Sequence, residues 1–221
     1  MKLAERIRAF TSEQRKFNEA VSLATRYLNN GKVIIVAAEF GYVYLADAFN
    51  TDAVKRIHIL RRDKAGVASQ VFIKNIDVLS GIAAPLSQMQ IDVLKKFWPG
   101  LLSVTLKPQA GLTWDLGDER RLGFINVRIP KRDFLSKVLE STGPLASASI
   151  AFAGNTVITD LSELIFSEAD VGAVFDEGIL ETGPATTILK FSENEITLIR
   201  EGALSLSDLQ VLIPSILPAN L

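Results

Sequence analysis

The sequence predicts a mixed α/β protein in which a mixed sheet carries helices on its faces. Segments with apolar residues at helical spacing alternate with short apolar runs that are typical of strands. This alternation lacks the strict strand-helix-strand rhythm of an all-parallel sheet. Two late strand segments, residues 186–190 and 196–199, are close enough in sequence to pair antiparallel. A sheet that mixes parallel and antiparallel pairs fits these observations.

Size and composition favour a single domain, residues 1–221. The chain has 221 residues, of which 48% are hydrophobic, enough for a substantial core. No apolar run reaches the ~18 to 20 residues that a membrane span needs, and the charged N-terminus lacks a signal-peptide apolar region. No repeat, linker or low-complexity block divides the chain. We therefore expect a soluble, cytoplasmic protein without a membrane partner.

Helices are expected where apolar residues recur at intervals of three and four. These sets are Phe17, Val21, Ala24 and Leu28; Val54, Ile57 and Leu60; Met89, Val93, Leu94 and Phe97; and Phe134, Val138 and Leu139. Capping residues mark the starts of the first three helices: Thr11 with Gln14, Asn50 or Thr51, and Ser87 with Gln90. Shorter helices are expected at residues 76–79, after Asp160 or Ser162, and after Ser205 or Ser207.

Strands are expected at the short apolar runs between these helices. Their ranges are 33–36, 69–73, 102–106, 124–129, 145–150, 172–175, 186–190 and 196–199. The sharpest connection lies before strand 102–106. Pro99 has a fixed φ and no N–H, and Gly100 accepts backbone angles closed to other residues, so the chain reverses there from helix into strand. The tail, residues 214–221, is expected to be frayed.

Residue counts exclude several kinds of chemistry. The chain has no cysteine, and therefore no disulfide, thiolate nucleophile or cysteine-bearing metal site. The single histidine, His58, cannot build a multi-histidine metal centre and is expected to be an ordinary, partly exposed side chain. A formal net charge of −1 gives no global field that attracts nucleic acid, and a local basic patch stays open. Neither a dinucleotide fingerprint nor a P-loop occurs.

Arg128 is the best candidate binding residue that the residue pattern alone indicates. It lies on an otherwise apolar strand, where a charge needs a partner or a solvent-lined cleft, so ligand binding and a structural ion pair both fit. Arg61 and Arg62 end a helix, where cations suit the helix dipole with or without a ligand. Ser149 and Thr186 have ordinary alternatives too, a backbone hydrogen bond and strand packing.

The run Phe97-Trp98-Pro99-Gly100, followed by Leu-Leu-Ser-Val-Thr-Leu, resembles a corner of the threonylcarbamoyl-AMP synthase family, the YrdC-like proteins. Further segments follow in the family's order, among them 127–130, 143–145 and 199–203, and the resemblance spans about residues 17 to 204. It implies a three-layer fold, a twisted mixed sheet with helices on both faces. It also implies an enzyme that condenses L-threonine, bicarbonate and ATP, with Mg²⁺, into threonylcarbamoyl-AMP and pyrophosphate for tRNA modification.

The resemblance assigns site residues position by position. The nucleotide-binding positions that it implies are Arg61, Arg62, Ser149 and Arg200. The substrate-binding positions that it implies are Tyr42, Arg128 and Thr186, with Arg128 suited to the threonine carboxylate. It identifies no catalytic side chain and no protein-bound metal.

Three positions depart from the family pattern: Ala38 replaces a threonine, Asp63 an arginine and Ala151 an asparagine. A carboxylate about 4 Å from a phosphate costs on the order of 4 kcal/mol at an effective dielectric constant of ~20. A shift of this loop that presents Arg62 or Lys64 to the phosphates is a possible compensation.

Three functions therefore stay open. The first is the synthase itself, with tRNA or tRNA-modification proteins as further partners. The second is a catalytically degraded paralogue that binds a nucleotide, RNA or a partner from the translation apparatus. The third is a carbamoyl-transfer enzyme with a different acceptor.

Overall fold

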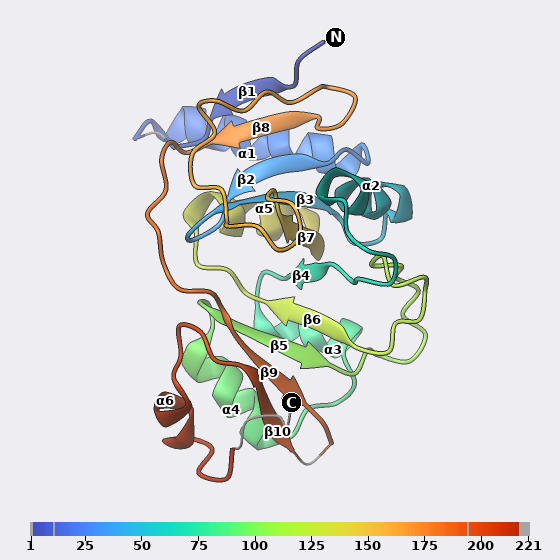
Figure 1. Ribbon diagram of the computed structural model, residues 1–221, viewed down its shortest axis with the longest axis vertical. Helices are drawn as coiled ribbons and strands as arrows, with labels where there is room; N and C mark the ends of the chain where they lie inside the picture. Colours follow the sequence, from blue (N-terminus) through green and yellow to red (C-terminus); the bar gives the residue numbers. More distant parts are fainter. Residues whose placement is uncertain (1, 11, 194, 217–221) are drawn as a thin grey trace.

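The computed structural model describes residues 2–10, 12–193 and 195–216, which form a strongly mixed α/β structure (Figure 1). Its strands are β1 (Glu5–Arg8), β2 (Ile34–Ala37), β3 (Tyr42–Asp47), β4 (Gln70–Phe72), β5 (Leu102–Leu106), β6 (Ile125–Arg128), β7 (Leu145–Ser149), β8 (Ala173–Asp176), β9 (Thr187–Phe191) and β10 (Ile196–Arg200). Its helices are α1 (Gln14–Asn29), α2 (Thr51–Arg61), the 3₁₀ helix η1 (Ile76–Val78), α3 (Leu79–Ile82), α4 (Gln88–Phe97), α5 (Asp133–Thr142) and α6 (Leu206–Gln210).

The described strands form one sheet in the order β1-β8-β2-β3-β7-β4-β6-β5-β9-β10. Four neighbouring pairs are parallel, β1 with β8, β8 with β2, β4 with β6, and β5 with β9, and the others are antiparallel. The late pair β9 and β10 is antiparallel, as the sequence predicted. The mixed sheet with helices on its faces is therefore confirmed.

Different helices cover the two faces of the sheet. On one face, α1 and α5 pack against each other, and their residues Leu28 and Phe134 join Phe175 of β8 in one hydrophobic cluster. On the opposite face, residues of α2, α4 and α6 belong to a larger cluster with the inward side chains of the central strands. Figure 1 shows α1 and α5 against β8, β2 and β3, whereas α4 and α6 lie by β5, β9 and β10.

The predicted corner between α4 and β5 is present. Ser87 and Gln90 form a capping box at the start of α4, and the helix ends at Phe97 before Pro99. The Trp98 indole N–H donates to the Leu102 carbonyl oxygen at 2.7 Å, which fixes the corner against the strand. A Cβ on Gly100 would lie 2.9 Å from the Phe97 carbonyl oxygen, so close backbone approach requires glycine here.

Two details of this helix differ from the expectation. Met89 is 54% exposed and does not face the core, whereas Gln90 is buried. The Gln90 amide donates to the Ser192 carbonyl oxygen at 2.7 Å, so a polar side chain ties α4 to the β9–β10 turn. A satisfied amide can occupy a core position that the apolar pattern gives to a hydrophobic residue.

Other differences concern whole elements. The sequence predicted neither β1, which pairs with β8 at the edge of the sheet, nor β3, which lies between β2 and β7. The helix expected after Asp160 or Ser162 is wrong, because the Asp160 carboxylate accepts from the Ser162 N–H at 2.9 Å and closes a turn. The predicted cap Thr11 and the end of the tail, 217–221, lie outside the described residues, and Ile216 before them is buried.

No helix among the residues placed by the structure is long and apolar enough to cross a bilayer.

Candidate functional site

Arg61 ends α2, and its guanidinium is bound by a carboxylate and by backbone carbonyl oxygens of this chain. Its Nε donates to both carboxylate oxygens of Asp63 at 3.1 and 3.0 Å. Its Nη1 donates to the carbonyl oxygens of Ser149 and Ala151, the latter at 3.2 Å. The Asp63 side chain is 3% exposed, so this ion pair is shielded from water. The predicted nucleotide-binding cation is thus bound internally by the residue that departs from the family pattern.

His58 holds Asp63 from the other side. Its Nδ1 lies 2.9 Å from Asp63 Oδ2, and its Nε2 lies 2.8 Å from the Leu116 carbonyl oxygen and 3.0 Å from the Ser69 hydroxyl. The side chain is only 14% exposed, so His58 is more enclosed than the sequence indicated. A Cβ on Gly117, whose φ is +98°, would lie 2.1 Å from Nε2, and this contact requires glycine.

Arg62 and Ser149 lie beside this ion pair. Arg62 has the left-handed conformation, with φ 55°, and its guanidinium stacks over the Phe152 ring at 4.6 Å. Phe152 is 46% exposed, so Arg62 stays on the surface beside the segment that follows β7. The Ser149 hydroxyl accepts from the Ala151 N–H at 3.2 Å, which is the backbone role considered as its alternative.

Arg128, the predicted threonine-binding residue, is 5% exposed and forms a buried ion pair with Glu39. Its Nε donates to the Gly100 carbonyl oxygen at 2.8 Å, and its guanidinium lies 5.7 Å from the Phe72 ring centre. Glu39 Oε1 also accepts from the Lys131 N–H at 2.7 Å. The structure thus realises the ion-pair alternative, and a ligand carboxylate would compete with Glu39 for Arg128.

Thr186 and Arg200, which the resemblance assigned separately, lie in contact. Arg200 donates to the Thr186 carbonyl oxygen at 2.7 Å and to its hydroxyl at 2.8 Å. Partial burial lowers the pKa of Arg200 from its ordinary value. This pair adjoins the Arg128 group through the backbone at Gly100 and Leu101, since Leu101 accepts from the N–H of Thr187 at 2.9 Å.

Tyr42 is fully buried, and its hydroxyl serves the fold. The oxygen lies 2.9 Å from Asp176 Oδ1 and 2.7 Å from the Gly178 carbonyl oxygen, and it accepts from the Glu177 N–H at 2.9 Å. Burial raises the pKa of the Tyr42 hydroxyl well above its ordinary value. A direct contact between Tyr42 and a substrate does not fit this geometry.

The predicted residues therefore form two groups. The Arg61 group comprises His58, Arg61, Arg62, Asp63 and Ser149, and the Arg128 group comprises Glu39, Arg128, Thr186 and Arg200. Among the contacts described above, none joins one group to the other. A ligand that used both arginines would have to bridge them.

Sequence reasoning missed several polar side chains near these groups. Arg132 pairs with the nearly buried Glu177 at 2.9 Å, and burial raises the pKa of the Glu177 carboxyl. Gln70 and Asn126 share a hydrogen bond across β4 and β6. Asn126 lies two residues before Arg128 in the predicted strand 124–129, so the two together are a sequence signal that this face of the strand is polar.

Asp63 places a buried carboxylate where Arg61 would meet the phosphates of Mg-ATP. Within the described ranges, no three His, Cys, Asp or Glu side chains gather as metal ligands. The Asp63 carboxylate already contacts both Arg61 and His58. Phosphates at Arg61 would therefore meet a buried negative charge rather than a second cation.

The fold and these arginine groups define a YrdC-like α/β protein. A model of the Sua5/YciO/YrdC family, described as "Telomere recombination", matches residues 26–202, and the chain belongs to this family. The chain is 24% identical over 202 residues to a putative threonylcarbamoyl-AMP synthase from Mycobacterium leprae, covering 91% of this chain and 90% of that protein. It is 25% identical over 209 residues to threonylcarbamoyl-AMP synthase from Bacillus subtilis, covering 92% of this chain and 59% of that protein.

Solved structures share the fold. Sua5 from Pyrococcus abyssi in complex with L-threonine matches with a TM-score of 0.80 and 23% identity over 99% of this chain. The chain spans only 63% of that protein's length. YciO from E. coli matches with a TM-score of 0.75 and 21% identity, over 92% of this chain and 97% of YciO. The three-layer fold expected from the resemblance is confirmed by these likenesses.

Proposed function

We propose that this chain is a ligand-binding member of the family that makes threonylcarbamoyl-AMP poorly or not at all. The supporting observation is that the Asp63 carboxylate pairs with Arg61 and also contacts His58. Family enzymes carry an arginine at this position by the resemblance described above. A second cation that would hold ATP phosphates is thus replaced by a carboxylate.

The ion pair works against phosphate binding in two ways. A phosphate can reach the Arg61 Nε only by displacing Asp63, and the displaced carboxylate stays on the same short loop. The repulsion is on the order of 4 kcal/mol at about 4 Å and an effective dielectric constant of ~20, roughly a thousandfold in affinity. Ala151 adds to the effect, because it lacks the side-chain amide that family enzymes place there.

The Arg128 group supports retained binding. By the resemblance, Arg128 and Arg200 match the family pattern, Thr186 conservatively replaces a serine, and Glu39 keeps the carboxylate at its position. L-threonine, which is bound in the Pyrococcus abyssi structure, is the first ligand to test on this chain. An amino acid whose carboxylate replaces Glu39 at Arg128 would be bound without being activated by ATP.

The experiment measures pyrophosphate release that depends on both L-threonine and ATP, together with ligand-induced shifts in melting temperature. The wild type should gain stability with L-threonine and release little or no pyrophosphate. The double variant Asp63→Arg with Ala151→Asn, which restores the family residues, should gain turnover. Wild-type turnover equal to that of the Bacillus subtilis relative under the same conditions would overturn the proposal.

A second candidate is the synthase reaction itself. It is favoured by Arg62, which stays on the surface next to Ser149 and is a cation available to replace the missing arginine. If Arg62 serves this purpose, Arg62→Ala abolishes pyrophosphate release while Arg56→Ala, which removes an exposed arginine of the preceding helix α2, leaves it unchanged. Equal rates for the two variants would rule this candidate out.

A further inference from the structure

A pocket of about 470 Å³ lies where the parallel strands β1 and β8 end. It is lined by Arg6, Arg8, Phe10, Asp176, Glu177 and Gly178. Figure 1 shows the ends of both strands on the same side of the sheet. Open α/β sheets bind their ligands at the carboxyl ends of parallel strands, so the position suits a ligand. The pocket contains no residue of the Arg61 group or of the Arg128 group.

The alternation along β1 directs two arginines and an aromatic ring toward one face of the sheet. Ile7 and Ala9 pack in the hydrophobic cluster with α1 and α5. Arg6, Arg8 and Phe10 alternate with them, so their side chains lie on the opposite face. The Ala9 N–H donates to a β8 carbonyl oxygen at 2.9 Å, which extends the pairing beyond the strand itself. Phe10 is 73% exposed, so its ring forms an apolar wall at the pocket.

The chain itself satisfies Arg6 and Asp176. Arg6 Nε donates to Asp176 Oδ2 at 2.9 Å. Asp176 Oδ1 accepts from the Gly178 N–H at 2.7 Å and from the Tyr42 hydroxyl at 2.9 Å. Both carboxylate oxygens of Asp176 are thus paired, and this ion pair shapes the pocket without offering a free group to a ligand.

Two other groups at the pocket lack a partner in the described part of the chain. The exposed Arg8 guanidinium forms no ion pair or hydrogen bond there. The Glu177 side chain is 6% exposed; its Oε2 accepts from Arg132 at 2.9 Å, whereas its Oε1 is buried without a hydrogen-bond partner. Burial raises the pKa of this carboxyl, so its ionised form gains from a further cationic donor. An anion and a donor would complete the pocket.

We propose that this pocket binds a free α-amino acid with an apolar side chain. The ligand carboxylate pairs with Arg8, and the ligand ammonium donates to Glu177 Oε1. Its side chain packs against the Phe10 ring and removes part of that ring from water. Each of the three ligand groups thereby meets a group that the fold leaves unpaired or exposed.

Ligands with a single charge fit the pocket less well. An anion satisfies Arg8, but it leaves the buried Glu177 oxygen without a donor and adds a negative charge beside two carboxyl groups. An amine satisfies Glu177, but it lies beside the cations Arg6 and Arg8. The pocket volume falls within the roughly 300 to 1,000 Å³ of small-molecule sites, which leaves room for an amino-acid side chain.

Isothermal calorimetry of the full chain with L-leucine tests the pocket, with two analogues of the same branched shape. Isocaproate lacks the ammonium, and isoamylamine lacks the carboxylate. L-leucine should bind at least about tenfold more tightly than either analogue, because each analogue loses one charge-assisted contact. Equal binding of isocaproate would show a simple anion site and overturn the proposal. Absence of L-leucine binding at millimolar concentration would overturn it too.

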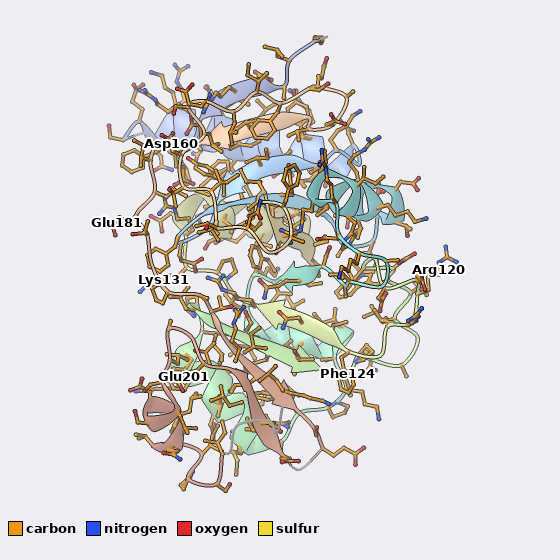
Figure 2. The ribbon with its side chains drawn as sticks, in the orientation of Figure 1. Arg120, Phe124, Lys131, Asp160, Glu181 and Glu201 are labelled. Atoms are coloured by element: carbon orange, nitrogen blue, oxygen red, sulfur yellow. The ribbon has the colours of Figure 1, made fainter. Side chains whose placement is uncertain are left out.

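Matched variants locate the site. Arg8→Gln should weaken L-leucine binding by about tenfold or more, whereas Arg15→Gln, which removes an exposed arginine of α1, should not. Glu177→Gln removes the charge that faces the ammonium and should also weaken binding. Glu181→Gln, at the exposed residue labelled in Figure 2, is its control and should not. Equal effects of variant and control would overturn the assignment, and melting temperatures establish that each variant is folded.

The contact with the ligand side chain is tested through Phe10. Phe10→Ala should weaken binding of L-leucine several-fold and leave binding of glycine unchanged, since glycine has no side chain to pack. Phe124→Ala, which removes another exposed phenylalanine, should change neither affinity. If Phe10→Ala weakened glycine and L-leucine equally, the ring would not contact the ligand side chain, and an apolar preference set by Phe10 would be ruled out.

The outcomes remain separate from those of the proposed function. L-leucine binding that is lost in Arg200→Ala and kept in Arg8→Gln would place the ligand at the Arg128 group and overturn the proposal. Pyrophosphate release by the Asp63→Arg, Ala151→Asn variant should be the same with and without Arg8→Gln. Failure of L-leucine to bind leaves the pyrophosphate result standing, and a fully active wild type leaves the L-leucine result standing.

Discussion

Arg61 and Arg128 each pair with a carboxylate of this chain, but only the partner of Arg128 agrees with the family pattern. Glu39, the partner of Arg128, lies where family enzymes also carry a carboxylate. Asp63, the partner of Arg61, lies where they carry an arginine, and His58 fixes it from behind. On the proposed function, the Arg128 pair allows ligand exchange and the Arg61 pair closes a ligand position. A single substitution that satisfies its neighbour can remove a binding function and leave the fold intact.

The largest effect is expected from breaking the Arg128 pair. Arg128→Ala leaves Glu39, whose side chain is 11% exposed, without its cation, and should lower the free energy of unfolding by about 3 to 5 kcal/mol. Urea denaturation measures the change. The double variant Arg128→Met with Glu39→Gln should recover most of it, and a double variant as unstable as Arg128→Ala would contradict a stability effect through the ion pair.

Breaking the Arg61 pair should cost less. In Asp63→Ala, Arg61 keeps the carbonyl oxygens of Ser149 and Ala151, so we expect a loss of about 2 to 3 kcal/mol. The same variant should bind ATP more tightly, because the repelling carboxylate is gone. Isothermal calorimetry measures ATP affinity, and an affinity unchanged from the wild type would show that Asp63 does not close the position.

The contact between His58 and Asp63 can be tested by a substitution at Gly117, which lies against His58. Gly117→Ala places a methyl group against His58 at a positive φ, and should destabilise by about 1 to 3 kcal/mol. Gly66→Ala is the matched control, since its φ is +83° and no atom lies within 4 Å of the added group. The difference between the two measures the His58 contact. If both variants lose equal stability, the contact contributes nothing.

The smallest effect concerns pH and Glu177, which forms an ion pair with Arg132. Burial raises the pKa of the Glu177 carboxyl above 4.5, so the folded state holds its proton more tightly than the unfolded state. Stability from this group is therefore present at low pH and falls as pH rises from about 4.5 through the folded-state pKa. Glu177→Gln should remove this slope. The free energy of unfolding of the wild type and of Glu177→Gln is measured from pH 4 to 8. The same dependence on pH in both proteins would contradict the prediction.

Local signals in the sequence sufficed for much of the fold. The Ser87 capping box, Pro99 and Gly100 determine the α4–β5 corner through short-range contacts, and the apolar spacing of Val54 and Ile57 predicts the buried side of α2. The edge strand β1 escaped prediction, because its sequence, Glu-Arg-Ile-Arg, has one apolar residue and gains its strand conformation from β8.

The sequence predicted residues of the candidate site, but it did not predict which residues they contact. Family positions identified Arg61, Arg128 and Arg200, and Asp63 lies only two residues from Arg61, but other contacts join distant segments. Glu39 lies 89 residues before Arg128, and Leu116 lies 58 residues after His58. Only folding brings such groups together, so no local pattern shows that each arginine is already bound.

The strand β1 has a consequence for solubility. It forms one outer edge of the described sheet, and its outer backbone groups have no strand beside them. Three of its four residues are charged, Glu5, Arg6 and Arg8. A second chain that added a strand there would have to bring its own side chains against these charges. The edge therefore discourages the strand-to-strand association through which open sheets aggregate.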